Sequence, residues 1–406
     1  QQRAIIMKPY IFRERYLNKI KPFVNKELIK VFVGQRRVGK SYLMYQIIDF
    51  LQKEDNKRHS IYINKELNEF DDIKNYQQLY DYVKSKSLSD KINYLFIDEI
   101  QNIENFENAL KSFTAEGNFD IYCTGSNADL LSGELATYLS GRYVEFNIFP
   151  LSYNEFLTFH NLTDQIKSLD LFLKYGGLPY LKNLQLEDDI VFDYLKNVYQ
   201  AILFRDIVLR FKLRNVEFLE RLILFLAKHT GTIFSARNIV KFLKSQNIKI
   251  SVSSVLDYVN YLKTAFFISK ANRTDIQGKK VFEVGEKYYF TDIGLRNTIA
   301  GFSPFELNLI IENAVYNHLQ YLGYKILVGQ SGDKEIDFIA EKNNEKVYIQ
   351  VALRISSEEM TKREFGNLLE INDNYPKYVI TLDEYTGTTY KGVKHTPLRE
   401  FLIEFE

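Results

Sequence analysis

The stretch from residue 29 to residue 51 restricts the fold of this chain more than any other part of it. An apolar run, Ile29–Val33, leads directly into Gly34-Gln35-Arg36-Arg37-Val38-Gly39-Lys40-Ser41, which matches the pattern G-x-x-x-x-G-K-[ST] without deviation. After the motif, apolar residues at positions 43, 44, 47, 48 and 51 fall on one face of a predicted helix. A strand, a glycine-containing loop and a helix in this order predict a loop that binds phosphate groups.

The residue types of the motif explain this chemistry. Glycines let the loop turn tightly, so that successive backbone N–H groups face the phosphates. The ammonium group of Lys40 would reach the β- and γ-phosphates, and the Ser41 hydroxyl would ligate Mg²⁺. The helix that follows adds the positive end of its dipole. We therefore expect the residues that bind ATP to be Gly34, Gln35, Arg36, Arg37, Val38, Gly39, Lys40, Ser41 and Tyr42.

Two acids follow another apolar run and complete the expected site. Short apolar runs at 60–63, 94–97, 120–123 and 143–146 alternate with amphipathic stretches, as in a parallel sheet wrapped by helices. Asp98 comes directly after the run 94–97, where a carboxylate can enter the magnesium shell. Glu99 is placed to orient or deprotonate the attacking water. Together with Lys40, these acids predict a magnesium-dependent ATPase.

Polar residues at two further strand ends are candidates for catalysis. Asn127 or Ser126, after the run 120–123, could contact the γ-phosphate or the attacking water, although either could be only a turn residue. Arg142 precedes the fifth run and could stabilise charge in the transition state, or it could be a surface arginine. We predict Asn127 and Arg142 as catalytic residues. For Arg142 we favour action within one chain over action across a subunit interface.

The rest of the chain changes its pattern twice. We predict an ATPase core at residues 1–150, a helical lid at 151–214, a winged helix at 215–302 and a further α/β domain at 303–406. The winged helix is predicted because three helical stretches are followed by two short β-rich pieces.

The motifs of this chain resemble a family of prokaryotic AAA-like ATPases, close to the archaeal-type and STAND-like branch. The resemblance rests on Arg13 with Tyr16, the loop at 34–41, FIDEIQN at 96–102, TGSNADLLS at 124–132, SGRY at 140–143, FPLSYNEF at 149–156, GGLP at 176–179, KEIDFIA at 334–340 and YIQVAL at 348–353. It implies an ASCE-type P-loop core and a C-terminal restriction-endonuclease-like domain. It also implies that Arg13 and Tyr16 lie near the adenine, and that Gly177 and Pro179 form a nucleotide-sensing turn in the lid.

The predicted winged helix is a weak candidate for DNA binding. Its presumed recognition helix, 251–262, contains Asp257 and no Lys or Arg. The predicted wing carries the cations Lys270, Arg273, Lys279, Lys280 and Lys287. Because neutralisation of phosphates supplies most non-specific affinity for DNA, a helix without cations is a weak reader. Contact with DNA and docking against the protein itself or a partner both stay open.

The terminal domain has part of the active site that its resemblance to PD-(D/E)xK nucleases implies. Glu312 and Asp337 stand where acids would hold Mg²⁺, but Gln350 takes a place where an acid is commoner and Ala352 takes the place of the lysine. We predict a nuclease-like fold with little or no nuclease activity. Glu312 and Asp337 remain candidate metal ligands, because with Glu335 they form three carboxyl groups that would repel one another without a cation.

Composition limits the remaining function classes. Lys and Arg total 53 against 52 Asp and Glu, so a role with nucleic acid needs a local basic face. The single cysteine, Cys123, excludes an internal disulfide and a cysteine-based zinc site. The first residues lack the pattern of a signal peptide, and no apolar run approaches the about 20 residues that cross a bilayer. We expect a cytoplasmic protein without a membrane partner.

These observations predict an ATP-hydrolysing molecular switch with ATP and Mg²⁺ as its cofactors. ATP would close the lid, the lid would move the winged helix, and the terminal domain would receive the change. DNA or an unknown protein would be its partner, and the chain would be a monomer or assemble with nucleotide. Two alternatives stay open: an ATP-dependent nuclease of a defence or mobile-element system, and an ATP-gated binding module that turns over very slowly.

Overall fold

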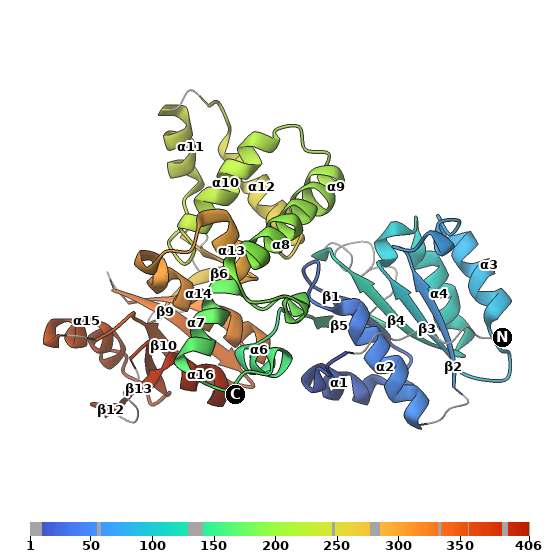
Figure 1. The fold of residues 1–406 in the computed structure, drawn as a ribbon, viewed down its shortest axis with the longest axis horizontal. Coiled ribbons are helices and arrows are strands. Elements are labelled where there is room, and N and C mark those ends of the chain that lie inside the picture. Colours follow the sequence, from blue (N-terminus) through green and yellow to red (C-terminus); the bar gives the residue numbers. More distant parts are fainter. Residues whose placement is uncertain are drawn as a thin grey trace. The chain divides into compact units, whose positions relative to one another are not determined.

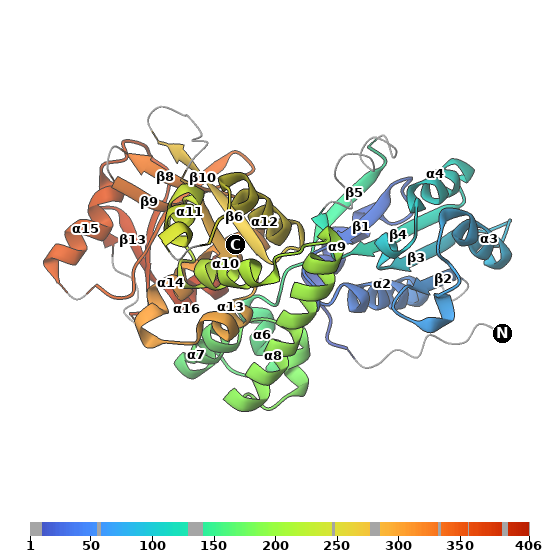
Figure 2. The same ribbon diagram turned by 90° about the horizontal axis from the view of Figure 1, so that it is seen from above.

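The chain forms two compact units. The computed structural model describes residues 10–54, 58–128, 141–245, 248–276, 285–331, 334–355, 357–383 and 389–405. The first unit comprises Gln1–Ile148 with Thr264–Phe266, and the second comprises Phe149–Lys263 with Phe267–Glu406 (Figures 1 and 2). The first unit ends close to the predicted limit of the ATPase core, at residue 150. The three regions predicted beyond it belong to one compact unit.

The first unit is built on a five-stranded parallel sheet with the strand order β2-β3-β4-β1-β5. The strands are β1 (Ile29–Val33), β2 (His59–Asn64), β3 (Asn93–Asp98), β4 (Phe119–Gly125) and β5 (Tyr143–Asn147). The helices are α1 (Glu14–Ile20), α2 (Lys40–Glu54), α3 (Tyr76–Lys86) and α4 (Phe106–Glu116), with 3-10 turns at Lys21–Phe23, Asn68–Phe70 and Ile100–Asn102. All five predicted runs are strands. β1, β3 and β4 are buried along their whole length, which explains why they read as continuous apolar runs.

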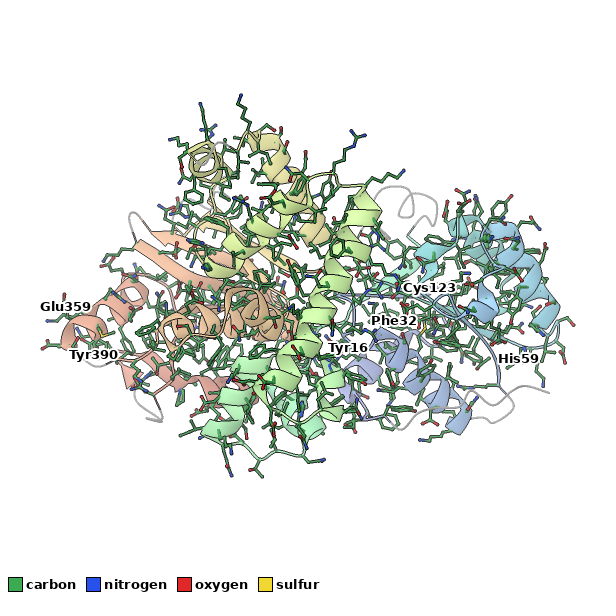
Figure 3. The ribbon with its side chains drawn as sticks, turned by 45° about the horizontal axis from the view of Figure 1, so that its top comes forward. Tyr16, Phe32, His59, Cys123, Glu359 and Tyr390 are labelled. Atoms are coloured by element: carbon green, nitrogen blue, oxygen red, sulfur yellow. The ribbon has the colours of Figure 1, made fainter. Side chains whose placement is uncertain are left out.

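The interior of this sheet contains one charged pair. The fully buried Lys30 of β1 pairs with Asp120 of β4, and the Tyr122 hydroxyl donates to the same carboxylate over 2.8 Å. Burial lowers the pKa of Lys30, and the charge of Asp120 opposes this. Since slipping β1 by one residue would separate the pair, it helps to fix the register of the two strands. Apolar side chains fill the rest of the core, with Phe32 and Cys123 in its interior (Figure 3).

The second unit begins with helices. The first group is α6 (Tyr153–His160), α7 (Ile166–Tyr175), a 3-10 turn (Pro179–Asn183) and α8 (Asp188–Ala201), which continues through a π-helix (Ile202–Val208) into α9 (Leu209–Phe211). The second group is α10 (Val216–Lys228), α11 (Ala236–Ser245) and α12 (Val252–Thr264). The remaining helices are α13 (Ile293–Ala300), a 3-10 turn (Pro304–Glu306), α14 (Leu307–Leu322), α15 (Glu358–Leu369) and α16 (Leu398–Glu404).

An eight-stranded mixed sheet with the order β12-β13-β11-β10-β9-β8-β6-β7 joins the later parts of this unit. Its strands are β6 (Ile268–Asp275), β7 (Lys287–Phe290), β8 (Lys325–Ser331), β9 (Lys334–Lys342), β10 (Glu345–Val351), β11 (Lys377–Thr381), β12 (Thr389–Tyr390) and β13 (Val393–Pro397). The antiparallel pair β6–β7 follows three helices, in the order predicted for a winged helix. However, β6 also pairs in parallel with β8, so the pair forms the edge of the large sheet. The predicted boundary at residue 302 therefore does not separate two compact units, and the winged helix stays a prediction.

None of the helices in the described ranges is both long enough and apolar enough to cross a membrane.

Candidate nucleotide site

The phosphate loop lies between β1 and α2 and needs glycine at Gly34. Gly34 has a φ of +152°, and a Cβ atom there would lie 2.2 Å from the carbonyl oxygen of Ile148. Lys40 is the first residue of α2 and is buried. Its ammonium group donates to the carbonyl oxygens of Gly34, over 2.9 Å, and of Gln35, over 3.1 Å. The lysine thus reaches back across its own loop, with backbone oxygens as its main partners.

The buried carboxylate of Asp98 lies at the end of β3 and accepts several hydrogen bonds. The Thr124 hydroxyl donates to one of its oxygens, and the Tyr62 hydroxyl donates to the other over 3.1 Å. Burial raises the pKa of Asp98, while hydrogen bonds from Ser41 and Thr124 lower it. Ser41 and Asp98 are therefore together, as we predicted for the two protein ligands of Mg²⁺. A hydroxyl and a carboxylate supply the oxygen ligands that this ion prefers.

Glu99 follows Asp98 in the left-handed backbone region, with a φ of 56°. This turn aims its backbone N–H at the Thr124 hydroxyl, 2.9 Å away, and its carboxylate accepts from the Ser126 hydroxyl over 3.2 Å. The other carboxylate oxygen lies 3.9 Å from Lys40 Nζ. Burial acts to raise the pKa of Glu99, but the charges of Lys40 and Arg36 and its hydrogen bonds lower it overall. These charges and hydrogen bonds favour the ionised form of Glu99.

Two residues of this site were not predicted. Gln101 donates its amide to the Glu99 carboxylate and lies 3.4 Å from the Ser126 hydroxyl. Tyr62 of β2 donates to Asp98, and its hydroxyl lies 3.2 Å from the Tyr45 hydroxyl. Gln101 stands in the FIDEIQN motif, but only the left-handed turn at Glu99 brings it back to the carboxylate. For Tyr62, the available signal was a polar residue near the end of the strand next to β3.

The segment before β1 packs against the phosphate loop. The guanidinium group of Arg13 lies 4.6 Å from the centre of the Tyr16 ring and donates to the carbonyl oxygen of Val38 over 3.2 Å. Both side chains are buried. Tyr42, by contrast, is exposed at the start of α2 and packs its ring against Tyr45. The contact of Arg13 with Val38 ties this segment to the loop, and its place beside the adenine stays a prediction.

The other predicted loop and strand-end residues lie at different places around the sheet. Arg36 pairs with Glu66 over 3.0 Å, and Arg37 is exposed with a φ of 72°. Asn127 lies just beyond β4 and is partly buried, whereas its neighbour Ser126 makes the contact with Glu99. The catalytic role of Asn127 stays a prediction.

Arg142 requires a correction. Its carbonyl oxygen accepts from the backbone N–H of Ile29 over 2.9 Å, and its side chain is exposed. Ile29 begins β1, whereas the phosphate loop follows the other end of that strand, about 16 Å away at the usual rise per residue. An arginine cannot extend over this distance. Action of Arg142 within one chain was therefore the wrong choice, because parallel strands place their starts and their ends at opposite edges of a sheet.

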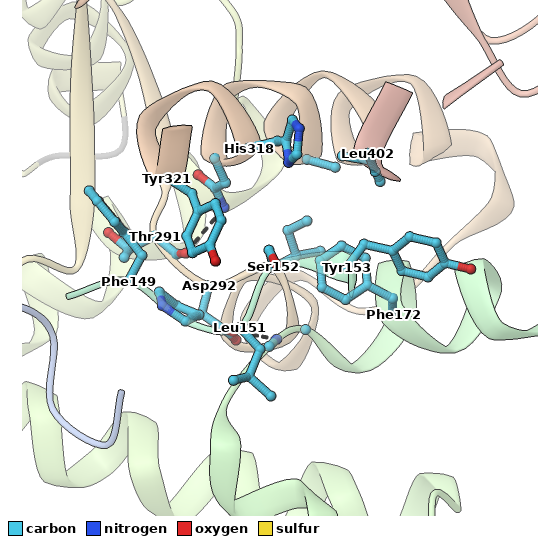
Figure 4. Close-up of a pocket in the computed structure, with 16 residues that line it drawn as sticks. Phe149, Leu151, Ser152, Tyr153, Phe172, Thr291, Asp292, His318, Tyr321 and Leu402 are labelled. Atoms are coloured by element: carbon cyan, nitrogen blue, oxygen red, sulfur yellow. Dashed lines mark hydrogen bonds between the residues drawn. The ribbon is translucent and has the colours of Figure 1, made fainter. Parts of the chain in front are cut away.

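Pro179 and Gly177 belong to the second unit, where they pack closely. Pro179 opens a 3-10 turn, and the backbone N–H of Gly177 donates to Asp292 over 2.8 Å. Gly177 lines a small pocket together with Ser152 and Thr291 (Figure 4). Burial raises the pKa of Asp292 to about 6. The motifs FPLSYNEF and GGLP thus meet at one place, and a nucleotide-sensing role for Pro179 stays a prediction.

The three acids of the terminal region surround Lys287, which corrects two expectations. Lys287 is only 3% exposed, and its ammonium group lies 2.7 Å from Glu335, 3.0 Å from Glu312 and 3.4 Å from Asp337. We expected a metal ion to balance these acids, but a lysine supplies the positive charge. Within the described ranges, no three acidic, histidine or cysteine side chains are arranged to hold a metal ion. Lys287 is also too buried to contact DNA from a wing.

Comparison with known proteins adds a family to this geometry. Residues 26–157 match the family described as "AAA domain", and residues 166–306 match a "Domain of unknown function (DUF8612)". The second match runs across the boundary that we predicted at 214. Neither match supports a restriction-endonuclease-like domain at 303–406.

The matches to two related proteins cover most of this chain. An uncharacterized protein of Haemophilus influenzae is 36% identical over 404 residues, which cover 98% of this chain and 100% of the relative. The uncharacterized protein MJ1544 of Methanocaldococcus jannaschii is 31% identical over 353 residues, which cover 83% of this chain and 77% of the relative. Among solved structures, the Aeropyrum pernix ORC1 protein in complex with DNA matches 76% of this chain and 97% of its own, with 12% identity. Its TM-score of 0.33 is too low to establish a common fold.

The phosphate loop, Asp98 and Glu99 all lie within the matched AAA domain, and the chain belongs to the family of AAA-domain proteins that includes the Haemophilus influenzae protein and MJ1544.

Proposed function

We propose that this protein is a magnesium-dependent ATPase that works as a molecular switch. The observation that carries the proposal is the meeting of Lys40, Ser41, Asp98 and Glu99 at the ends of β1 and β3. These four side chains come from two segments that are about sixty residues apart in sequence. The strand β1, which leads into the phosphate loop, and the strand β3 lie on either side of β4 in one sheet. They correspond to the parts that phosphoryl transfer requires: a cation, the ligands of a magnesium ion and a group that acts on water.

Lys40 is suited to receive the phosphates. The carbonyl oxygens of Gly34 and Gln35, to which it donates, are neutral, and a carboxylate oxygen of Glu99 lies 3.9 Å away. A phosphate oxygen carries a full negative charge and forms a stronger, charge-assisted hydrogen bond than a carbonyl does. Lys40 can therefore exchange its carbonyl partners for the β- and γ-phosphates of ATP.

Ser41 and Asp98 would hold the magnesium ion, which neutralises charge on the phosphate oxygens when it is bound. Thr124 and Tyr62 orient the Asp98 carboxylate by donating to its two oxygens. Because three hydroxyl groups converge on one buried acid, the carboxylate is held in place before any ligand arrives.

Glu99 would orient or deprotonate the attacking water. Gln101 and Ser126 donate to its carboxylate, so they set both its direction and its pKa. We assign Gln101 and Ser126 as positioning residues for Glu99. Ser126 also joins Glu99 to the end of β4, the strand that lies between β3 and the phosphate loop.

Arg13 and Tyr16 would lie on the adenine side, since their segment contacts the loop at Val38. Arg142 would act only on the nucleotide of a neighbouring subunit, in an assembly that forms with nucleotide. ATP-dependent changes would be passed to the second unit, which would act on DNA or on a protein partner. The nuclease alternative is weaker, because Ala352 occupies the lysine position and the ammonium group of Lys287 already lies among the acids.

The test removes the ammonium group of Lys40. Lys40→Ala should abolish ATP binding or hydrolysis, measured as the affinity for a fluorescent ATP analogue and as phosphate release with Mg²⁺. The matched control is Lys53→Ala, because Lys53 stands on the same helix, is 67% exposed, and contacts Asp49 and the Phe12 ring away from the phosphate loop. Wild-type turnover in Lys40→Ala, or an equal loss in both variants, would overturn the proposal.

A further inference from the structure

We propose that the exposed face of α11 binds the phosphate backbone of nucleic acid. Three cations, Arg237, Lys241 and Lys244, are exposed on this helix. Their spacing of four and three residues places them in one stripe along the helix. We call these three side chains the α11 stripe. The helix lies at the edge of the second unit (Figure 1), beside α10 and α12.

The charges of the α11 stripe have no counterions in the described part of the chain. None of the ion pairs found there involves Arg237, Lys241 or Lys244, and α11 contains no Asp or Glu. Some other exposed cations on helices of this protein have a counterion on the same helix. Lys53 pairs with Asp49 and Lys362 pairs with Glu358, each one turn away on the same helix. The α11 stripe is therefore a local positive field on a chain whose net charge is only +1.

The opposite face of α11 fixes the direction of the stripe. Ala236, Ile239 and Leu243 are buried, so the helix cannot turn its cations inward. Phe242 lies next to Lys241 and is 54% exposed, although exposing a phenylalanine ring to water is unfavourable. An aromatic ring beside cations is the combination that binds single strands, because the ring stacks on a base while the cations contact phosphates.

The shape of the stripe favours a nucleic acid over other anions. From residue 237 to residue 244 a helix rises about 10 Å, which suits a polymer with repeated phosphates better than one isolated phosphate. Membrane-surface helices need an exposed apolar face, and here that face is buried. The helix expected to read DNA, α12, exposes Asp257 and has Lys263 as its only cation. The contact is therefore assigned to α11 instead of α12.

This inference names the partner of the proposed switch but does not depend on ATP hydrolysis. Nucleic-acid binding by the α11 stripe should persist in Lys40→Ala, since Lys40 lies in the first unit. Loss of hydrolysis and loss of binding can thus be separated by two variants, one in each unit.

The experiment measures the affinity of the full chain for short labelled DNA duplexes, single-stranded DNA and RNA duplexes across a series of salt concentrations. The variant is Arg237→Ala with Lys241→Ala and Lys244→Ala. The control is Lys74→Ala with Lys86→Ala and Lys91→Ala, which removes three exposed cations from the first unit. The stripe variant should bind more weakly, and the slope of log K against log salt should fall by about 0.9 for each DNA phosphate that the variant no longer neutralises. The control should keep the wild-type slope.

Phe242→Ala gives a second readout. It should weaken the affinity for single-stranded DNA while leaving the salt slope unchanged, because stacking does not release counterions. The proposal would be overturned by an equal loss of affinity in the control, by unchanged affinity in the stripe variant, or by failure of the wild-type chain to bind any of the probes at low salt. Equal binding to polyglutamate that disappears in the stripe variant would point to an acidic protein instead.

Discussion

Two buried lysines, each close to carboxylates, have opposite surroundings in this protein. Lys40 in the first unit donates to two backbone carbonyls, and its nearest acid is Glu99, 3.9 Å away. Lys287 in the second unit lies within 3.4 Å of three carboxylates, and these raise its pKa against the effect of burial. A cation with neutral partners can accept an anionic ligand. A cation shared by three acids has no charge to spare.

The comparison separates a binding site from an internal ion cluster. The acids Glu99 and Asp98 accept hydrogen bonds from hydroxyl and amide donors as well as facing Lys40. The acids around Lys287 depend on the lysine itself, together with the Tyr289 hydroxyl, which donates to Glu312 over 2.8 Å. The same residue types therefore give one cluster built around a phosphate loop and one in which an internal lysine is shared by three acids.

The largest expected effect comes from removing the charge of Lys287. Lys287→Met leaves buried carboxylates without their cation, and breaking such a pair costs about 3–5 kcal/mol. In urea unfolding of the full chain, the free energy of unfolding of the second unit should fall by this amount. Lys40→Met should change the stability much less, because it leaves carbonyl groups, and not three carboxylates, without their donor. Equal losses in the two variants would contradict the distinction.

The next effect concerns the catalytic acid. Glu99→Gln should slow ATP hydrolysis by roughly 100-fold or more, the usual contribution of a general base, and should retain ATP binding. Glu335→Gln in the second unit is the matched control and should hydrolyse ATP at the wild-type rate. Turnover of Glu99→Gln at the wild-type rate would show that our role for Glu99 is wrong.

A smaller effect should appear in the pH dependence of stability. Burial and the charge of Glu312 raise the pKa of Asp337 from 3.8 to about 7, despite Lys287. Between these values the unfolded chain has released the proton and the folded chain still holds it. Stability should therefore fall as the pH rises from about 4 to 7, by at most about 1.4 kcal/mol per pH unit. Thermal unfolding of Asp337→Asn should lack this component, and an identical pH dependence in both proteins would contradict it.

The smallest expected effect tests the positioning of Glu99. Ser126→Ala removes one hydrogen bond, worth about 1 kcal/mol, that lowers the pKa of Glu99. The pKa should rise, and because only the ionised form acts as a base, the acid limb of kcat should move to higher pH. Ser126→Thr keeps the hydroxyl and should restore the wild-type profile. An unchanged acid limb in Ser126→Ala, with altered KM only, would make Ser126 a purely structural residue.

Local patterns were sufficient for much of the first unit. All five strands agree with prediction, because apolar runs are contiguous in sequence, and the predicted magnesium ligands Ser41 and Asp98 lie together. The second unit was harder to divide. The strand β6 follows helices of one predicted domain yet pairs with β8 of the next, and strand pairing across so long a separation has no local signal.

The errors at individual residues have the same origin. Arg142 stands in a recognisable motif, but the edge of the sheet at which it lies depends on how β5 pairs with β1. Gln101 reaches Glu99 only through a left-handed turn, which a glutamate seldom adopts. In both cases the residue type was informative, and its direction in space was not.

The order of the amino acids alone was enough to locate the phosphate loop, since its glycines, Lys40 and Ser41 act within a single turn of the chain. The order of the amino acids did not indicate the partners of Lys287, because Glu312 is 25 residues away in sequence and Asp337 is 50. Only the packing of α14 against β7 and the sheet that contains both β7 and β9 bring these charges together. Once they are together, the low polarity of the interior makes the pairing obligatory, since a buried carboxylate without a cation is far too costly.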